Sequence, residues 1–495
     1  MINLLPLFVA IPMGAAFLML GVAAINRRFT DILANLSTLA LLVISIALYF
    51  VRPFNQVMIY KLGAWAAPVG INLVLDGLSH FLVLTINLIA FLATFYSISY
   101  MEKYVGKRNY YTLFMLMVAG LNGVVLTGDL FNLFVFLEIA AVASYSLVAF
   151  GTESEELEAA YKYLIMGAVA STMILFGIAL IYGLTGSLNM ADVALNFPAS
   201  AGLAKAFILV LFLMGFGMKA AIVPFHAWLP DAHPSAPAPI SAMLSGVLIK
   251  ALGIYSLVRI IFNVLGFTPA LSSAMIALGV ISMIVGVLLA IGQWDFKRLL
   301  AYHSISQIGY VILGIGLGTP LGIMGGLFHL FNHALFKSLL FLNAGAVDYV
   351  CGTRELKEMG GLAKKMPVTG TTSLVASMSI AGIPPFNGFW SKLFIIIACV
   401  QSGHLWAAFA AVLGSLLTLA SFLKVQKYGF FEKLKSQYET IKEAPLTMCL
   451  PMIVLAILCL GVGLAYPFVN EYILNPAVIA VTNGVGYGKI ILGGL

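Results

Sequence analysis

Charged residues are scarce in this sequence. Only 9% of its 495 residues are Asp, Glu, Lys or Arg, and 62% are hydrophobic, whereas about a quarter of the residues in an ordinary soluble protein are charged. So low a charge content excludes a soluble globular protein and indicates an integral membrane protein. No polar stretch between the apolar segments is long enough to form a soluble domain.

Cysteine is scarce as well, and cofactor motifs are lacking. The four cysteines, Cys351, Cys399, Cys449 and Cys459, form no CxxC pair, the spacing that is typical of metal and redox sites. We interpret them as small buried hydrophobic residues. Because no flavin, nucleotide or iron-sulfur motif is present either, we expect the chain to hold no cofactor, so that any redox energy comes from partner subunits.

Long apolar segments recur from one end of the chain to the other. A bilayer core of about 30 Å requires about 20 apolar residues in one helix. The sequence therefore predicts an all-α membrane protein with fourteen spans, at residues 4–25, 31–51, 79–101, 111–128, 131–150, 160–184, 203–229, 238–259, 271–291, 297–317, 320–347, 370–402, 404–424 and 447–468. The first segment lacks the marks of a signal peptide, so we expect a retained helix. Segment 52–78 is predicted to be an external loop with a small hairpin.

The net charge of +7 is best interpreted from the positions of the basic residues along the chain. On the fourteen-span prediction, seventeen of the 26 lysines and arginines fall on one side of the membrane and four inside it. Five fall on the opposite side: Arg52, Lys61, Lys205, Arg259 and Lys489. The positive-inside rule then places both termini outside the cytoplasm. We expect the protein to lie in the inner cell membrane of a prokaryotic-type cell. The basic charge thus indicates topology and argues against a nucleic-acid partner.

Two spans are interrupted by proline in a similar way. One contains Pro224 in MKAAIVPFHAWLP, and the other contains Pro384 and Pro385 in SIAGIPPFNGFWSK. Proline removes a backbone donor and breaks or kinks a helix, and broken backbone at membrane depth is tolerated where protein covers it or where it lines a wet cavity. Paired breaks of this kind indicate a transport site.

The breaks fall in spans 7 and 12, and this spacing predicts the domain organisation. An offset of five spans reverses the direction across the membrane, so we predict two inverted five-helix repeats at residues 111–262 and 263–425. Residues 1–110 would hold helices 1–3 with the external loop. Residues 426–495 would form a cytoplasmic loop, helix 14 and an external tail. Two unrelated proline kinks are the alternative.

Five charged residues lie well inside apolar spans, namely Glu138, Lys219, Lys250, Lys337 and Lys392. Ionisable groups at this depth usually pair or touch water, and they mark ion or proton paths. Lys219 is the preferred partner for Glu138, because the proline break beside it makes room for water. Burial disfavours a charged amine, so a lysine can release its proton when its partner moves away, whereas arginine cannot. Four lysines and no arginine at this depth favour proton exchange over structural pairing or snorkelling.

Span 11 places three titratable residues on one helix face. His329, His333 and Lys337 follow one another at intervals of four, about 6 Å apart along the axis. Histidine exchanges protons near neutral pH, so this stripe predicts a proton relay. An HxxxH pair without a neighbouring glutamate is a weak metal motif, and we expect no metal.

Three further histidines are secondary candidates. His303 in span 10 could extend the relay. For His226 and His233, a proton entrance and simple helix packing both stay open.

Three stretches resemble a known family: KAAIVPFHAWLPDAHPSAPAPISAMLSGVLIK (219–250), DFKRLLAYHSISQIGY (295–310) and AGIPPFNGFWSK (381–392). They are similar to the antiporter-like subunits shared by Mrp-type cation/proton antiporters, respiratory complex I and membrane-bound hydrogenases. The resemblance covers spans 3–13. It implies a fourteen-helix fold with inverted repeats, broken helices 7 and 12, and a lateral chain of buried charges.

The resemblance also implies individual roles. Glu138 matches the glutamate of helix 5, and Lys219, Lys250 and Lys392 match the lysines of helices 7, 8 and 12. His329, His333 and Lys337 match the relay of helix 11, and the lysine at 392 resembles that of the D-type component of Mrp antiporters and of its complex I and hydrogenase counterparts.

These observations predict an antiporter-like subunit that moves protons, with exchange for sodium left open. Its expected partners are the lipid bilayer and the other membrane subunits of a hydrogenase-like or Mrp-type complex, with redox subunits as a further option. The alternatives are a proton-pumping subunit of a complex I-type quinone reductase, a self-sufficient solute transporter, and a passive membrane scaffold.

Overall fold

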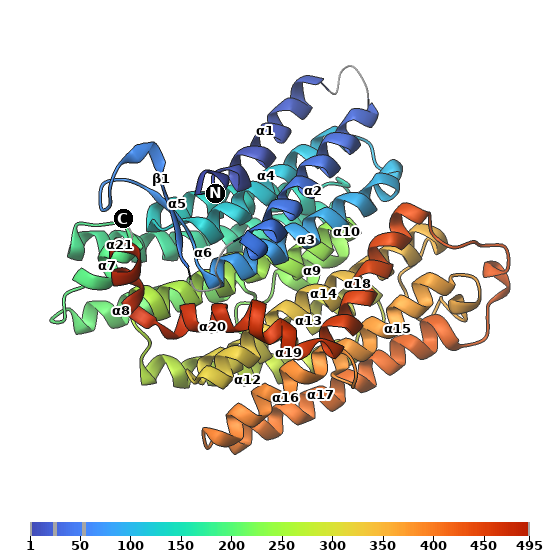
Figure 1. Cartoon of the computed structure of the whole chain (residues 1–495). Coiled ribbons are helices and arrows are strands. Elements are labelled where there is room, and N and C mark those ends of the chain that lie inside the picture. Colours follow the sequence, from blue (N-terminus) through green and yellow to red (C-terminus); the bar gives the residue numbers. More distant parts are fainter. Residues whose placement is uncertain (1, 23–26, 52–55, 494–495) are drawn as a thin grey trace.

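The structure is a computed structural model that describes residues 2–22, 27–51 and 56–493. Long helices pack side by side in an almost entirely α-helical bundle (Figure 1). Within the described residues, thirteen helices are long and apolar enough to cross a membrane. The remaining predicted span, 370–402, is present as two half-helices of 15 residues each. The predicted all-α membrane fold is confirmed. Arg52 and the predicted end of the first span, at residues 23–25, lie outside the described residues.

The elements follow one another in an order close to the prediction. The α-helices are α1 (Leu7–Val22), α2 (Arg27–Val51), α3 (Gly77–Tyr100), α4 (Lys107–Leu126), α5 (Leu130–Val148), α6 (Ser154–Thr185), α7 (Met190–Asn196), α8 (Gly202–Lys219), α9 (Leu229–Ser235), α10 (Ala238–Met243), α11 (Ser256–Val258), α12 (Pro269–Ile291), α13 (Phe296–Gly316), α14 (Pro320–Cys351), α15 (Pro367–Ala381), α16 (Asn387–Gln401), α17 (Leu405–Val425), α18 (Leu446–Leu464), α19 (Tyr466–Val469), α20 (Asn475–Thr482) and α21 (Tyr487–Gly493). Wider π-helical turns are η4 (Leu244–Tyr255), η5 (Arg259–Val264), η7 (Gln426–Phe431) and η9 (Asn470–Leu474), and short 3-10 turns are η1 (Ile2–Leu4), η2 (Leu62–Ala64), η3 (Met101–Lys103), η6 (Leu362–Lys364), η8 (Ser436–Tyr438) and η10 (Gly484–Gly486).

The predicted hairpin after α2 is present. Strands β1 (Met58–Lys61) and β2 (Asn72–Leu75) pair antiparallel, with Met58 opposite Leu75. These two strands form the only sheet among the described residues, apart from isolated bridges.

Both predicted helix breaks are present. Helix α8 ends at Lys219 and α9 begins at Leu229, while α15 ends at Ala381 and α16 begins at Asn387. The prolines in each gap have no backbone N–H to continue a helix. The second break is packed so closely that glycine is required beside it, since a Cβ atom on Gly463 of α18 would lie 2.2 Å from the carbonyl oxygen of Pro385.

The C-terminal segment is more ordered than a simple external tail. After α18 the chain continues through α19, η9 and α20, which run across the bundle and pack against α3 and α14 (Figure 1). Tyr466 at its start stacks on Trp390 of α16, and Asn263 of η5 donates hydrogen bonds to the carbonyl oxygens of Ala480 and Gly484. The C-terminal segment contacts both predicted repeats, because α21 packs against α7 of the first repeat and Tyr466 packs on Trp390 of the second.

Candidate functional site

Glu138 of α5 and Lys219 at the end of α8 form an ion pair. The carboxylate oxygen Oε1 of Glu138 lies 3.7 Å from Nζ of Lys219. The Lys219 side chain is 2% exposed and the Glu138 side chain 33% exposed. Ser171 of α6 donates a hydrogen bond to the same carboxylate oxygen, and Lys219 donates one to the Tyr145 hydroxyl at 3.3 Å.

Aromatic stacking fixes this pair to the first helix break. Tyr145 packs edge-on against Tyr163, with ring centroids 4.5 Å apart, and Tyr163 stacks on Trp228 at 4.1 Å. The Trp228 indole N–H donates to the Met218 carbonyl oxygen at 3.0 Å. Lys219 is the last residue of α8, directly before the first break.

Lys250 has no acidic partner. It is fully buried in the π-helical turn η4, and its amine donates to the carbonyl oxygen of Ser245. No carboxylate of the described residues lies within ion-pair distance of it. The hydroxyl of Ser245 contacts that of Ser304 on α13 at 2.7 Å. An unpaired buried ammonium is unfavourable, so Lys250 requires either water or a proton acceptor.

The α14 stripe lies in the interior of the bundle. His329, His333 and Lys337 are all fully buried. His329 is hydrogen-bonded through Nδ1 to Ser391 at 3.0 Å and through Nε2 to Gln307 at 3.1 Å. Both ring nitrogens of His333 and the amine of Lys337 have no hydrogen-bond partner in the part of the chain that the structure describes.

Such buried polar atoms normally bind ordered water when protein does not satisfy them. The stripe therefore combines a protein-bonded histidine, His329, with two groups beyond it whose polar atoms the described chain leaves unsatisfied.

Lys392 lies in α16, and its amine reaches the end of α15 across the second break. Its amine donates to the Ile380 carbonyl oxygen at 2.8 Å and to the Ser415 hydroxyl at 3.1 Å. Ile380 lies in the last turn of α15, where a cation is favoured by the partial negative charge of a helix C-terminus. Tyr310 connects this site to the stripe, because its ring lies 4.8 Å from the Lys392 amine and 5.3 Å from the His329 ring.

Two of the secondary histidines, His303 and His226, make no hydrogen bond to the stripe among the described residues. His303 is hydrogen-bonded through Nε2 to Ser421 of α17 at 2.8 Å and packs against Phe422. His226 lies half-buried in the first break, and its Nδ1 has no partner among the described residues. Among the same residues, no three His, Cys, Asp or Glu side chains come together as metal ligands.

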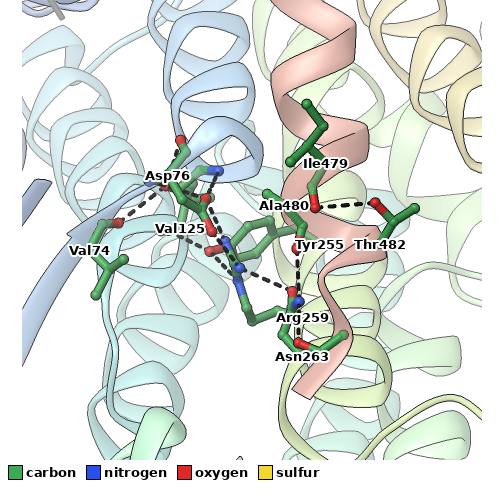
Figure 2. Close-up of polar contacts among 11 residues, drawn as sticks. Val74, Asp76, Val125, Tyr255, Arg259, Asn263, Ile479, Ala480 and Thr482 are labelled. Carbon is green, nitrogen blue, oxygen red and sulfur yellow. Dashed lines mark hydrogen bonds and ion pairs between the residues drawn. The ribbon is translucent and has the colours of Figure 1, made fainter. Parts of the chain in front are cut away.

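A buried ion pair that the sequence reasoning did not predict joins Arg259 to Asp76. Arg259 belongs to the span Ala238–Val264 and is buried, and its guanidinium donates hydrogen bonds of 2.7 and 2.8 Å to Asp76 (Figure 2). Burial by itself would raise the pKa of Asp76, but the Arg259 guanidinium holds it below the usual value. The sequence signal was present in YSLVRIIFNV, where apolar residues flank Arg259 on both sides.

Lys297 is a second residue whose burial the sequence reasoning did not predict. It was predicted on the basic side, at the first position of span 10, and in the structure its side chain is buried and its amine donates to the Ala236 carbonyl oxygen at 2.9 Å. The nearby apolar residues Phe296, Leu299 and Leu300 were the available signal.

Comparison with known proteins gives consistent matches over the whole chain. Residues 127–418 match the family model described as NADH:quinone oxidoreductase/Mrp antiporter, transmembrane part, and residues 65–114 match the model for the N-terminus of complex I chain 5. The chain is 35% identical over 478 residues to the D component of the Na+/H+ antiporter of Alkalihalophilus pseudofirmus, covering 96% of each. It is also 35% identical over 493 residues to the N component of the NADH-quinone oxidoreductase of Desulforudis audaxviator, covering 96% of each. Among solved structures, the Mrp complex from Dietzia sp. contains a chain that matches with a TM-score of 0.92 and 29% identity, over 99% of both.

Proposed function

Since the chain belongs to the NADH:quinone oxidoreductase/Mrp antiporter family of membrane subunits, we propose that it moves protons as one antiporter-like subunit of a multisubunit membrane complex. Sodium exchange is the second half of this proposal, and it rests on the named function of the Na+/H+ antiporter relative. The redox subunits and the energy source, where a complex has them, belong to the partners.

The proposed route follows the buried charges. Glu138 and Lys219 act as the switching pair: while they are close, the carboxylate stabilises the protonated amine, and when the α8 break moves, the amine releases its proton. Lys250 receives the proton and passes it to His333, Lys337 and His329. Lys392 is the terminal site.

A single observation carries this proposal. Lys250, Lys337 and His333 are fully buried, they have no acidic partner among the described residues, and two of them lack any protein hydrogen bond. A solute carrier would be expected to use neutral polar groups, and a passive scaffold has no need of buried amines. Retaining such groups in an apolar bundle is the mark of a proton or ion path.

We further propose two inverted repeats, 111–262 and 263–425, each containing one of the two broken helices. The 32-residue helices α6 and α14 occupy comparable places before the breaks, which supports this division. The end of the bundle that contains Lys103, Lys107, Arg298 and Arg354, here called the basic end, would face the cytoplasm, with both termini on the other side.

Transport by the assembled complex tests the proposal. The complex is expressed with its partner subunits, and everted membrane vesicles are assayed with a fluorescent pH indicator. Proton movement that depends on this chain supports the proposal, and vesicles whose assembled complex moves no protons contradict it.

A complex I-type quinone reductase is the second candidate, because the identity to the quinone reductase relative equals that to the antiporter relative. The match to the Mrp complex over 99% of both chains favours the antiporter assignment. Mass spectrometry of the subunits that copurify with the tagged chain separates the two, since only a quinone reductase brings flavin and iron-sulfur subunits with it.

A further inference from the structure

A buried lysine lies at the basic end of the bundle, outside the route described above. Lys297 is the second residue of α13, it is buried, and its amine donates to the Ala236 carbonyl oxygen at 2.9 Å. No carboxylate of the described residues forms an ion pair with it. It therefore resembles Lys250 and Lys337 in its chemistry, but it lies near the solvent boundary.

Two partly exposed ion pairs lie near Lys297. Arg354 pairs with Asp295 at 3.4 Å, and Lys103 pairs with Asp348 at 3.5 Å. Their side chains are 23–34% exposed, so water reaches them. All four act electrostatically on Lys297. Arg354 also donates to the Pro234 carbonyl oxygen at 2.5 Å, which places this layer directly over α9.

An unpartnered histidine lies on the inner side. His233 of α9 is fully buried, and neither of its ring nitrogens has a hydrogen-bond partner in the described chain. Its ring stacks on Phe341 with centroids 4.6 Å apart, and the Lys337 amine lies 5.7 Å from the centroid of the same ring. Lys337, Lys297 and Lys250 all act electrostatically on His233.

The series of groups therefore begins at the solvent-exposed ion pairs, continues through the buried amine of Lys297 and the imidazole of His233, and ends at the α14 stripe. We propose that Lys297 and His233 form the proton entrance of the basic end, through which Lys337 and Lys250 are loaded. This inference rests on the proposed function.

In the proposed step, the neutral Lys297 amine takes a proton from a hydronium ion of the solvent and becomes an ammonium, and the hydronium ion becomes a neutral water molecule. It passes the proton through water to a ring nitrogen of His233, which becomes an imidazolium. His233 then gives the proton to the neutral Lys337 amine, and each donor returns to its neutral form. No covalent bond other than those to the transferred hydrogen changes.

A helix-capping role for Lys297 is the rival explanation, and arginine distinguishes the two. Arginine can keep a hydrogen bond to the Ala236 carbonyl and keeps the charge, but it does not release its proton. Lys424 supplies a matched control, because its amine also donates to carbonyl oxygens at the basic end, those of Ile291 and Gln293, at 2.7 and 2.5 Å.

The experiment measures proton transport by the complete complex in proteoliposomes, with the variants Lys297→Arg, Lys297→Gln and His233→Gln and the controls Lys424→Arg and Lys424→Gln. We expect both Lys297 variants and the His233 variant to lose about tenfold or more of the rate, with the Lys424 variants close to wild type. We also expect the remaining rate of Lys297→Gln to rise as the pH on the basic side is lowered.

If Lys297→Arg transports protons at the wild-type rate, the proposed entrance is refuted, and Lys297 has only a helix-capping role. If neither Lys297 variant assembles, the His233 variant decides, because an assembled His233→Gln complex with the wild-type rate also overturns the proposal. A wild-type complex that moves no protons at all refutes the proposed function instead, so the two failures are distinguishable.

Discussion

Removing the charge of Glu138 is the sharpest perturbation of the switching pair. Glu138→Gln keeps the size of the side chain and an oxygen that can accept the Ser171 hydrogen bond, but it takes away the negative charge 3.7 Å from the Lys219 amine. At that distance, Coulomb's law with an effective dielectric constant of about 20 gives about 4.5 kcal/mol. Since a third of the Glu138 side chain is exposed, screening by water reduces this to about 1–2 kcal/mol.

Because about 1.4 kcal/mol corresponds to a factor of ten, the substitution changes the protonation equilibrium of Lys219 by roughly tenfold. We therefore expect the proton transport rate of Glu138→Gln to fall by about this factor or more. The assay is the pH-indicator signal in everted vesicles, divided by the amount of assembled complex seen on a native gel.

Asp31→Asn is the matched control for this substitution. Asp31 also pairs with a lysine, Lys107, at 2.9 Å, and it accepts a hydrogen bond from Tyr111, but it lies on α2, outside the proposed route. We expect it to keep the wild-type rate. A Glu138→Gln complex that assembles normally and transports as fast as wild type refutes the switching mechanism.

Three further predictions concern the lysine route, the buried ion pair and the second break. Lys250→Arg should assemble but transport at a small fraction of the wild-type rate in the same vesicle assay, because arginine keeps its proton; a near-normal rate would argue that Lys250 serves only as a fixed charge. Asp76→Ala should destabilise the protein by about 3–5 kcal/mol, since it leaves Arg259 buried without its partner; thermal denaturation of the purified complex measures this, and an unchanged midpoint would contradict it. Gly463→Ala should reduce assembly because its Cβ would lie 2.2 Å from the Pro385 oxygen, whereas Gly461→Ala on the same helix meets nothing within 4 Å; equal assembly on native gels would show that the break can shift freely.

The sequence was informative where the physics is local. Apolar length predicts a span, and proline predicts a break, so the helices and the gaps after Lys219 and Ala381 were predictable. The pairing of Glu138 with Lys219 was also expected, because few buried charges were available and each requires a partner. The spacing of His329, His333 and Lys337 required nothing beyond helix geometry.

What escaped prediction depends on contacts between distant segments. Asp76 and Arg259 are 183 residues apart, and both lie where a hydropathy window ends, so each was assigned to a span end or a loop. Lys297 was assigned to the first position of a span, so its burial was not predicted. Its burial comes from α9 packing over the start of α13, an arrangement that depends on how the first break folds back. The C-terminal segment likewise gains its place only from packing against α3 and α14.

Ordered water in the assembled complex tests the central claim most directly. The measurement is a high-resolution cryo-electron microscopy map of the complex in lipid nanodiscs, inspected around His333 and Lys337. The proton route predicts water density within about 3 Å of both ring nitrogens of His333 and of the Lys337 amine, continuing toward Lys250 and Lys392. A dry interior, with these atoms enclosed by apolar side chains and no water between them, would contradict it.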